Sequence, residues 1–486
     1  MKKIYLMISI FLSLSAFANY QNPSLKAFLE EFQKNPKEVM NQTPYKFEKV
    51  LPLTNLQIRS KISDKKKLIS YNKEQISGRN ILSILFKGSE NILTNAFEID
   101  EKPLKTVKLI EAPWAGYYWS MRNGLIAYRY ADKGFKWENN WEDRLEYVTK
   151  HPMTEYLERN KKLQVLSPAE KYDLLIGNYN GPIASEMWEE GKKEIEEFKE
   201  IRDWSGLCHG LAMAALKLPS PKYSIKVKSA DGKYLIKFYP EDIKALGVYH
   251  WGQDNIPLRM LGGRCEQTDI KTDSIGRAIE PDCRDPNPGS FHIALINRIG
   301  VQKKSLIMDS SRDAEVWNYP IVAYNFNFFN PNNGKQSFKL KNAMIPKTDY
   351  KNDKFSQYRS PSTEYIVGVE AKIDYHKSTD PEQEDKDTSG KELNSVIYRY
   401  DLELDSNGII IGGEWYTNSN PDFIWFPEDN ADPVAPYDNN ITSSWNPAKE
   451  GLPKDWIESA NSSATKGKVS SKIIKALFEL SNKGSN

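Results

Sequence analysis

The chain has 486 residues, of which 39% are hydrophobic and 12% aromatic, and this is enough to build more than one packed core. Lysine and arginine number 67 and aspartate and glutamate 65, so the formal net charge is only +2. This balance excludes the strongly basic surface that nucleic-acid binding requires, and we expect no nucleic-acid partner.

The first eighteen residues have the pattern of an export signal. Lys2 and Lys3 precede an apolar run, and Ala16-Phe17-Ala18 forms a small-x-small cleavage site. The run is shorter than a membrane span, and no later stretch approaches roughly 20 uninterrupted apolar residues. We therefore expect cleavage near Ala18, a secreted or periplasmic protein and no stable membrane insertion.

Residues 19–105 are rich in lysine and show no chemical constellation, which is typical of an accessory or pro-segment. A capping-box pattern at Ser167 predicts the start of a helix, and residues 185–201 predict a second one. Residues 208–216 read CHGLAMAAL, an alanine-rich helix that Pro219 stops. Cys208 is then expected at the N-terminus of that helix.

Alternating and apolar patterns predict strands after these helices, at residues 224–228, 233–239, 291–299, 304–309 and 365–375. A short turn at Gly300 separates the third from the fourth. Because helices come first and the sheet second, the order favours an α+β fold over alternating βαβ units.

Residues 377–391 are polar and charged, as in a linker or a mobile loop. Residues 395–404 and 409–415 flank an Asn407-Gly408 turn and predict a hairpin in a small β-rich C-terminal part. The predicted organisation is therefore a signal peptide (1–18), an accessory or pro-segment (19–105), a catalytic domain (106–376), a linker (377–391) and a β-rich C-terminal region (392–486).

The chain has three cysteines, an odd number for an oxidising compartment. Cys265 and Cys283 lie in polar, loop-like surroundings that suit a disulfide. Cys208 is the cysteine left over. A thiol at a helix N-terminus faces the positive end of the helix dipole, which should lower its pKa and supply N–H donors for an oxyanion.

A cysteine nucleophile needs a base held by a third group. His292 begins one predicted strand and Asp309 ends the next, so an antiparallel turn would bring them together. His209 is a poorer base because the next side chain on a helix points about 100° away. The alternative is that Cys208 is merely a small buried hydrophobe.

No cofactor is required by this chemistry. The histidines lack regular ligand spacing with one another, which argues against zinc. An acidic run at residues 428–438 leaves calcium open, but it lacks the ligand spacing of an EF-hand loop.

The strings WSGLCHGLAMAA, FHIALINR and LIMDSSRDAEVWNYP resemble the active-site segments of the transglutaminase elicitor family, a papain-like group known from oomycetes and some bacteria. The resemblance covers roughly residues 110–430 and excludes residues 19–105. It implies a papain-like or transglutaminase-like core, in which a helix carrying Cys208 packs on an antiparallel sheet carrying the base His292 and the orienting acid Asp309.

The activity that the resemblance implies is isopeptide formation between protein glutamine and lysine or another primary amine, through a cysteine thioester. Trp204 is a candidate for a wall that keeps water from that thioester, or else a core residue. Two alternatives stay open: a papain-like peptidase or deamidase with the same triad, and a non-catalytic secreted elicitor or binding protein.

Overall fold

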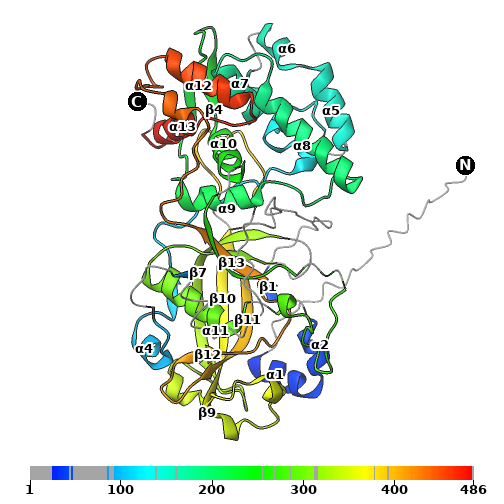
Figure 1. Cartoon of the computed structure of the whole chain (residues 1–486), viewed down its shortest axis with the longest axis vertical. Helices are drawn as coiled ribbons and strands as arrows, with labels where there is room; N and C mark the ends of the chain where they lie inside the picture. Colours follow the sequence, from blue (N-terminus) through cyan, green and yellow to red (C-terminus); the bar gives the residue numbers. More distant parts are fainter. Residues whose placement is uncertain are drawn as a thin grey trace, which may run out of the picture.

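The computed structural model describes the chain in segments that cover most of its length: residues 24–42, 45–47, 85–86, 92–136, 140–158, 163–253, 256–265, 267, 269–284, 286–310, 316–376, 378–390 and 393–483. The predicted export signal and much of the predicted pro-segment lie outside the described residues. The described chain forms a helical lobe and a sheet lobe, stacked along the long axis (Figure 1).

The helical lobe surrounds one apolar core that includes Cys208. Its elements are α5 (Trp141–Lys150), α6 (Met153–Glu158), α7 (Pro168–Leu175), α8 (Pro182–Phe198), α9 (Cys208–Lys217), α10 (Pro240–Gln253), α12 (Lys454–Ala464) and α13 (Ser471–Lys483), with a hairpin of β3 (Ile225–Lys228) and β4 (Leu235–Phe238).

Local sequence signals fix several of these elements as predicted. At the start of α7, Ser167 Oγ accepts from the Glu170 N–H at 3.2 Å, and the Glu170 carboxylate accepts from the Ser167 N–H at 2.9 Å. Helix α9 begins at Cys208, also as predicted. It lies so close to α10 that a Cβ on Gly210 would stand 2.3 Å from the Val248 carbonyl oxygen. This glycine therefore serves the packing of two helices.

The sheet lobe is built on a long antiparallel sheet with the order β1-β11-β10-β7-β6-β13-β5. These strands are β1 (Tyr45–Phe47), β5 (Leu258–Gly262), β6 (Ile307–Asp309), β7 (Asn318–Phe329), β10 (Tyr365–His376), β11 (Leu393–Leu404) and β13 (Phe423–Pro427). Shorter strands β2 (Thr106–Lys108), β8 (Gln336–Ser337), β9 (Ile345–Pro346) and β12 (Ile410–Gly412) extend it. The combination of helices with an antiparallel sheet is the α+β class that the sequence predicts.

Short 3₁₀ turns connect the larger elements: η1 (Met121–Asn123), η2 (Leu125–Ala127), η3 (Leu163–Val165), η4 (Pro281–Cys283), η6 (Leu340–Asn342), η7 (Lys347–Asp349), η8 (Ser356–Tyr358) and η9 (Asp438–Asn440). Helix α4 (Ala96–Glu101) lies on the sheet lobe (Figure 1).

The strand predicted at residues 291–299 is wrong. These residues belong to α11 (Pro288–Ala294) and a π-helical continuation, η5 (Leu295–Val301). The side chains of the segment are buried nearly all round, and an apolar run of this kind does not distinguish a strand from a buried helix by periodicity. The missed signal is the Asn287-Pro288 pair, because the Asn287 side chain caps the helix by accepting from the Gly289 N–H at 2.9 Å.

The prediction of a separate β-rich C-terminal unit is also wrong. Strand β11 pairs with β10 from Tyr365↔Leu404 to His376↔Leu393, so both strands belong to one sheet. The chain then returns to the other lobe, where α12 and α13 join the helical core. The aromatic ring of Phe478 on α13 fills the space beside Gly247 of α10. The residues around 377–391 therefore connect two paired strands and do not separate two domains.

The N-terminal segment packs on the sheet lobe through α1 (Leu25–Lys34) and α2 (Pro36–Met40). Phe28 and Phe32 of α1 lie in an apolar cluster with Phe329, Phe355 and Tyr416 of the sheet lobe. Next to it, the Met40 carbonyl accepts from the Asn418 N–H at 2.7 Å. The described part of this segment is thus integrated into the core of the lobe.

Candidate active site

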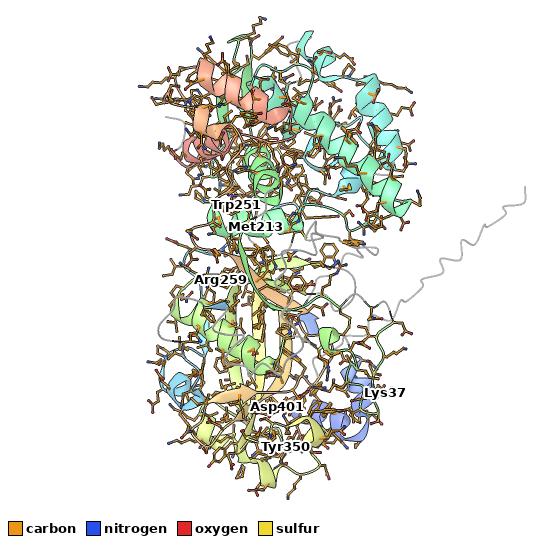
Figure 2. All side chains as sticks on the ribbon, viewed as in Figure 1. Lys37, Met213, Trp251, Arg259, Tyr350 and Asp401 are labelled. Carbon is orange, nitrogen blue, oxygen red and sulfur yellow. A yellow bond between two sulfur atoms is a disulfide. The ribbon has the colours of Figure 1, made fainter. Side chains whose placement is uncertain are left out.

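Cys208 lies where the helical lobe meets the sheet. Helix α9 runs along the lower face of its lobe, and Figure 2 places Met213 of α9 beside Trp251 of α10 just above the sheet. The Cys208 thiol lies at the start of β7, where it contacts the Asn318 Nδ2 at 3.3 Å and, two residues before the strand, the Val316 carbonyl oxygen at 3.9 Å.

The orientation of the Asn318 amide follows from its second partner. Trp425 Nε1 donates to Asn318 Oδ1 at 2.8 Å, and an indole nitrogen can only donate. The oxygen of the amide must therefore face Trp425, and its NH₂ group must face the sulfur of Cys208. Asn318 is thus held as a hydrogen-bond donor to the thiol.

A narrow crevice leads to Cys208. Its lining residues are Trp114, Ala115, Gly116, Tyr118, Cys208, Leu211, Trp317, Asn318, Tyr319, Pro320, His376 and Ser378. The open volume inside is only about 20 Å³, which is room for about one water molecule. A glutamine side chain cannot enter this crevice unless its walls move apart.

The closed crevice holds the Cys208 thiol in its neutral form. Burial raises its pKa to about 11, and the charge of Asp309 acts in the same direction. The Asn318 amide and the backbone N–H groups of Asn318 and His209 oppose this shift, because they donate to the sulfur. The lowered thiol pKa that the helix N-terminus predicts is therefore outweighed by burial in this state.

Asp309 stands beside the site, as the sequence predicts, but not with His292. It pairs with Asn318 across β6 and β7. Its Oδ1 accepts from the Trp317 N–H at 2.8 Å, and its side chain is fully buried. Asp309 thereby fixes the turn of chain that carries Trp317 into the crevice wall.

The structure does not bring His292 to Cys208. The His292 ring packs edge-on against Phe326, with ring centroids 4.7 Å apart, and its Nδ1 lies 2.9 Å from the Tyr400 hydroxyl. Phe326 follows Asn318 by eight residues on β7, which is roughly 26 Å of strand. Burial lowers the pKa of His292 to about 3. The pairing of His292 with Cys208 fails because residues 291–299 form a helix on the sheet and not a strand within it.

The histidine that shares the crevice with Cys208 is His376. It is the last residue of β10, and a register shift between Asp374 and Tyr375 comes directly before it. Such a bulge redirects the side chains that follow it. The local sequence signal for His376 was only its place at the end of a predicted strand, whereas its meeting with Cys208 depends on the pairing of β10 with β7.

The other two candidates near the nucleophile lie away from the crevice. Trp204 is buried in the helical core, with the Arg202 guanidinium 4.4 Å from its ring centroid, and it does not line the described crevice. His209 Nε2 lies 2.9 Å from the Gly252 carbonyl oxygen on the side of α10. In this structure Trp204 therefore lies in the core of the helical lobe and not on the crevice wall.

Cys265 and Cys283 form a disulfide in the structure, and Cys208 is the free cysteine. No group of three or more His, Cys, Asp or Glu side chains within the described segments is placed to hold a metal ion. In the acidic run, Asp429 binds Arg298 and Lys304, and Asp438 accepts from Ser470 and Ser471. These carboxylates already have protein partners.

Replacing Asn318 by alanine should raise the pKa of the Cys208 thiol further, because the thiolate loses its side-chain donor. A rise of one unit would slow alkylation by iodoacetamide at pH 8 about tenfold. The measurement is the alkylation rate between pH 7 and 11. Asn325→Ala is the matched control, since Asn325 lies on the same strand and its amide bonds only to Thr106 in the described contacts. Equal profiles for the two variants would contradict this role.

Two of three comparisons with known proteins found a match. The family model described as "Transglutaminase elicitor" matches residues 187–443, which is more than half of the chain. The crystal structure of the GP42 transglutaminase from Phytophthora sojae has a similar fold, with a TM-score of 0.52 and 18% sequence identity over 85% of this chain and 99% of that chain. The search of curated proteins finds no match. The chain therefore belongs to the transglutaminase elicitor family.

Proposed function

We propose that the protein is a cysteine acyltransferase that joins glutamine side chains to primary amines, lysine side chains among them. The observation that carries the proposal is the crevice in which Cys208, at the N-terminus of α9, meets the Asn318 amide and His376. Membership of the family and the fold shared with a transglutaminase support it.

The reaction needs a nucleophile, a proton carrier and donors for an oxyanion. His376 takes the proton of the Cys208 thiol, and the sulfur attacks the carboxamide carbon of glutamine. The C–N bond then breaks, and ammonia leaves with the proton from His376, so that a thioester remains. The amine nitrogen then attacks the thioester carbon and gives a proton to His376; the C–S bond breaks, and His376 returns that proton to the departing Cys208 sulfur.

The remaining polar groups of the site stabilise charge and position the walls. The Asn318 Nδ2 and the first N–H groups of α9 can donate to the oxyanion of the tetrahedral intermediate. Asp309 holds Trp317 in the crevice wall. The aromatic walls, Trp114, Tyr118 and Trp317, shield the thioester from water and thereby favour an amine as acceptor.

We assign the substrates to proteins outside the cytoplasm. The Cys265–Cys283 disulfide fits an oxidising compartment, and the N-terminal sequence pattern fits export with cleavage near Ala18. In the described part of the chain, no helix combines the length and the apolar character that crossing a bilayer demands.

The test is incorporation of a labelled primary amine into a glutamine-rich protein by the purified chain, with ammonia release followed in parallel. We expect both signals, and we expect Cys208→Ala to lower both to background. Ammonia without label would make the protein a deamidase with the same nucleophile.

One observation favours the non-catalytic alternative, namely that the Cys208 thiol is buried and its pKa raised to about 11. A secreted elicitor recognised as a surface would not need a reactive thiol. In that case Cys208→Ala would retain full elicitor activity, and the wild-type chain would incorporate no amine under any condition that keeps it folded.

A further inference from the structure

The segment between β10 and β11 does not behave as the linker that its composition indicates. Residues 378–390, named the strap below, leave the sheet lobe after His376 and run against the helical lobe. At its first residues, the Thr379 N–H and the Ser378 hydroxyl both donate to the Gly116 carbonyl oxygen, at 3.1 and 3.4 Å. The strap therefore starts on the crevice wall.

The middle of the strap is fastened to the β3–β4 hairpin and the residues before it. Asp385 accepts from the Ser224 hydroxyl at 2.7 Å and forms an ion pair with Lys237 at 2.5 Å. The Lys237 ammonium lowers the pKa of Asp385. Lys386 forms an isolated β-bridge with Tyr223. These contacts hold the strap in an extended path on the helical lobe.

A buried lysine anchors the end of the strap. Lys244 of α10 is 1% exposed, and its Nζ donates to Asp387 Oδ1 at 2.8 Å and to Ser389 Oγ at 2.5 Å. The same Nζ donates to the Ala115 carbonyl oxygen at 2.8 Å. One ammonium group thus ties the strap to the crevice wall.

The strap therefore meets the Cys208 crevice at both of its ends. Ala115 and Gly116, which it binds, line the crevice together with Ser378 of the strap itself. At its far end, a Cβ on Gly390 would lie 3.5 Å from the His376 ring and 4.0 Å from the Ala115 Cβ. Any widening of the crevice on this side requires the strap to shift.

The strap can also detach without disrupting the core of either lobe. Its only non-polar side chain is that of Pro381, so its detachment exposes no core residue. It is held by hydrogen bonds and ion pairs, and a single hydrogen bond contributes only about 1 kcal/mol to stability. The buried anchor does not lose all charge compensation when Asp387 leaves, because Lys244 also pairs with Glu241 at 3.1 Å.

From these contacts we infer that the strap is an autoinhibitory latch: it holds the crevice shut over Cys208, and its release admits the substrate. The consequence for acyl transfer rests on the proposed function, whereas the latch itself is measured as access to the thiol.

The locking experiment uses the double variant Ala115→Cys/Gly390→Cys. The 4.0 Å separation of the two Cβ positions falls within the range of disulfides. With the new bond closed, we expect alkylation of Cys208, followed by mass spectrometry, to be at least tenfold slower than in the wild type. Gly390→Cys alone is the matched control, because it carries the same change at a backbone φ of +80° without the cross-link.

The releasing experiment uses Asp387→Asn, which removes the charge that holds the strap to Lys244. We expect alkylation of Cys208 to be at least fivefold faster. Asp432→Asn is the control, because it breaks an ion pair with Lys475 in which no strap residue takes part. If locking does not slow alkylation and release does not speed it, the latch is wrong. If both respond as expected but no variant incorporates amine, the latch stands and the acyltransferase proposal fails.

Discussion

Replacing His376 by glutamine should lower the rate of labelled-amine incorporation at least 100-fold. Removal of a general acid–base group from an enzyme typically costs about 10²- to 10⁴-fold, and His376 is the histidine that shares the crevice with Cys208. Glutamine retains hydrogen-bonding groups but cannot carry a proton between the sulfur and the leaving ammonia. The measurement is the initial rate per milligram of folded protein.

His292→Gln is the matched control, because it makes the same replacement at a histidine in the core of the sheet lobe. Its amide would stand beside Phe326 and the Tyr400 hydroxyl. We expect a loss of about 1–3 kcal/mol in the free energy of unfolding, since a buried polar group is left poorly satisfied. The rate per folded molecule should change less than about threefold. If His292→Gln lowered the rate at least 100-fold and His376→Gln changed it less than about threefold, His292 would be the base.

The elements that could be predicted are those with local signals. The capping box at Ser167 and the run CHGLAMAAL between Cys208 and Pro219 each combine a start or stop residue with a helical pattern, and both helices form as expected. The Asn407-Gly408 turn likewise predicts the hairpin of β11 and β12. Gly408 adopts a φ of +78°, a left-handed conformation that favours glycine. In each case the deciding contacts lie within a few residues along the chain.

The proposed base, His376, could not be found in this way because its position depends on the pairing of strands that are distant in the sequence. The apolar segment that carries His292 fits a strand and a buried helix equally well, and only its packing on β11 decides for the helix. His376 reaches the crevice because Tyr375 pairs with Ile321 on β7 and a bulge follows Asp374. No local pattern in the sequence specifies that register.

The strap illustrates the same limit for polar sequence. Its composition is typical of a disordered linker, because it has almost no side chain that can be buried. What orders it is Lys244, which is more than 130 residues away in the chain and needs anionic partners for its buried ammonium. A polar segment is thus held in place by a buried charge on another element, which takes anionic partners from both its own helix and the strap.

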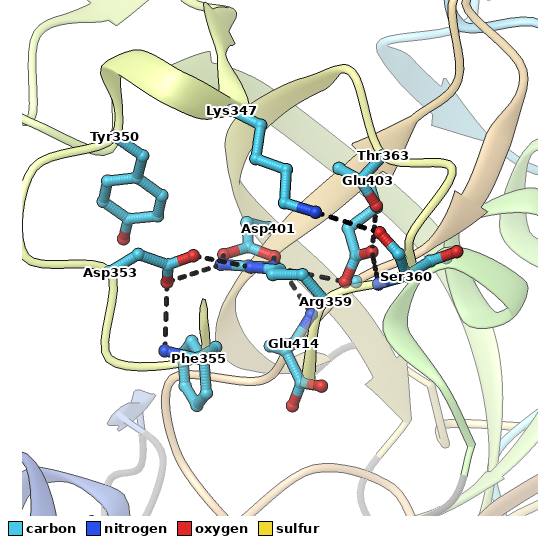
Figure 3. A network of polar contacts seen from close by, with 12 residues as sticks. Lys347, Tyr350, Asp353, Phe355, Arg359, Ser360, Thr363, Asp401, Glu403 and Glu414 are labelled. Carbon is cyan, nitrogen blue, oxygen red and sulfur yellow. Dashed lines mark hydrogen bonds and ion pairs between the residues drawn. The ribbon is translucent and has the colours of Figure 1, made fainter. Parts of the chain in front are cut away.

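The largest effect on stability is expected from Arg359→Met, at about 3–5 kcal/mol at pH 7. The Arg359 guanidinium is fully buried at the centre of a carboxylate network in the sheet lobe (Figure 3). It binds Asp401 at 2.6 and 2.7 Å, Asp353 at 3.0 and 3.1 Å, and Glu403 at 3.4 Å. Methionine fills a similar volume but leaves these carboxylates without their cation.

The loss should become smaller as the pH falls. Burial already raises the pKa of Asp401 in spite of Arg359, and removal of that cation raises it further. An acid whose pKa is higher in the folded than in the unfolded chain favours folding below the unfolded value and loses that contribution as the pH rises through the folded one. The difference in the free energy of unfolding between the variant and the wild type should therefore be larger at pH 7 than at pH 5. Urea unfolding at the two pH values measures it.

Lys347→Met is the control for the loss of a long cationic side chain beside the same network. Lys347 donates to the Ser360 carbonyl oxygen at 3.1 Å and forms no ion pair among the described contacts, so we expect its loss to cost about 1 kcal/mol or less. Asp401 lies at the far end of the sheet lobe from α9 (Figure 2), so neither variant should alter amine incorporation per folded molecule. If Arg359→Met costs no more than Lys347→Met, the carboxylates must be neutral in the folded wild type, and the network would then be held by shared protons and not by the buried cation.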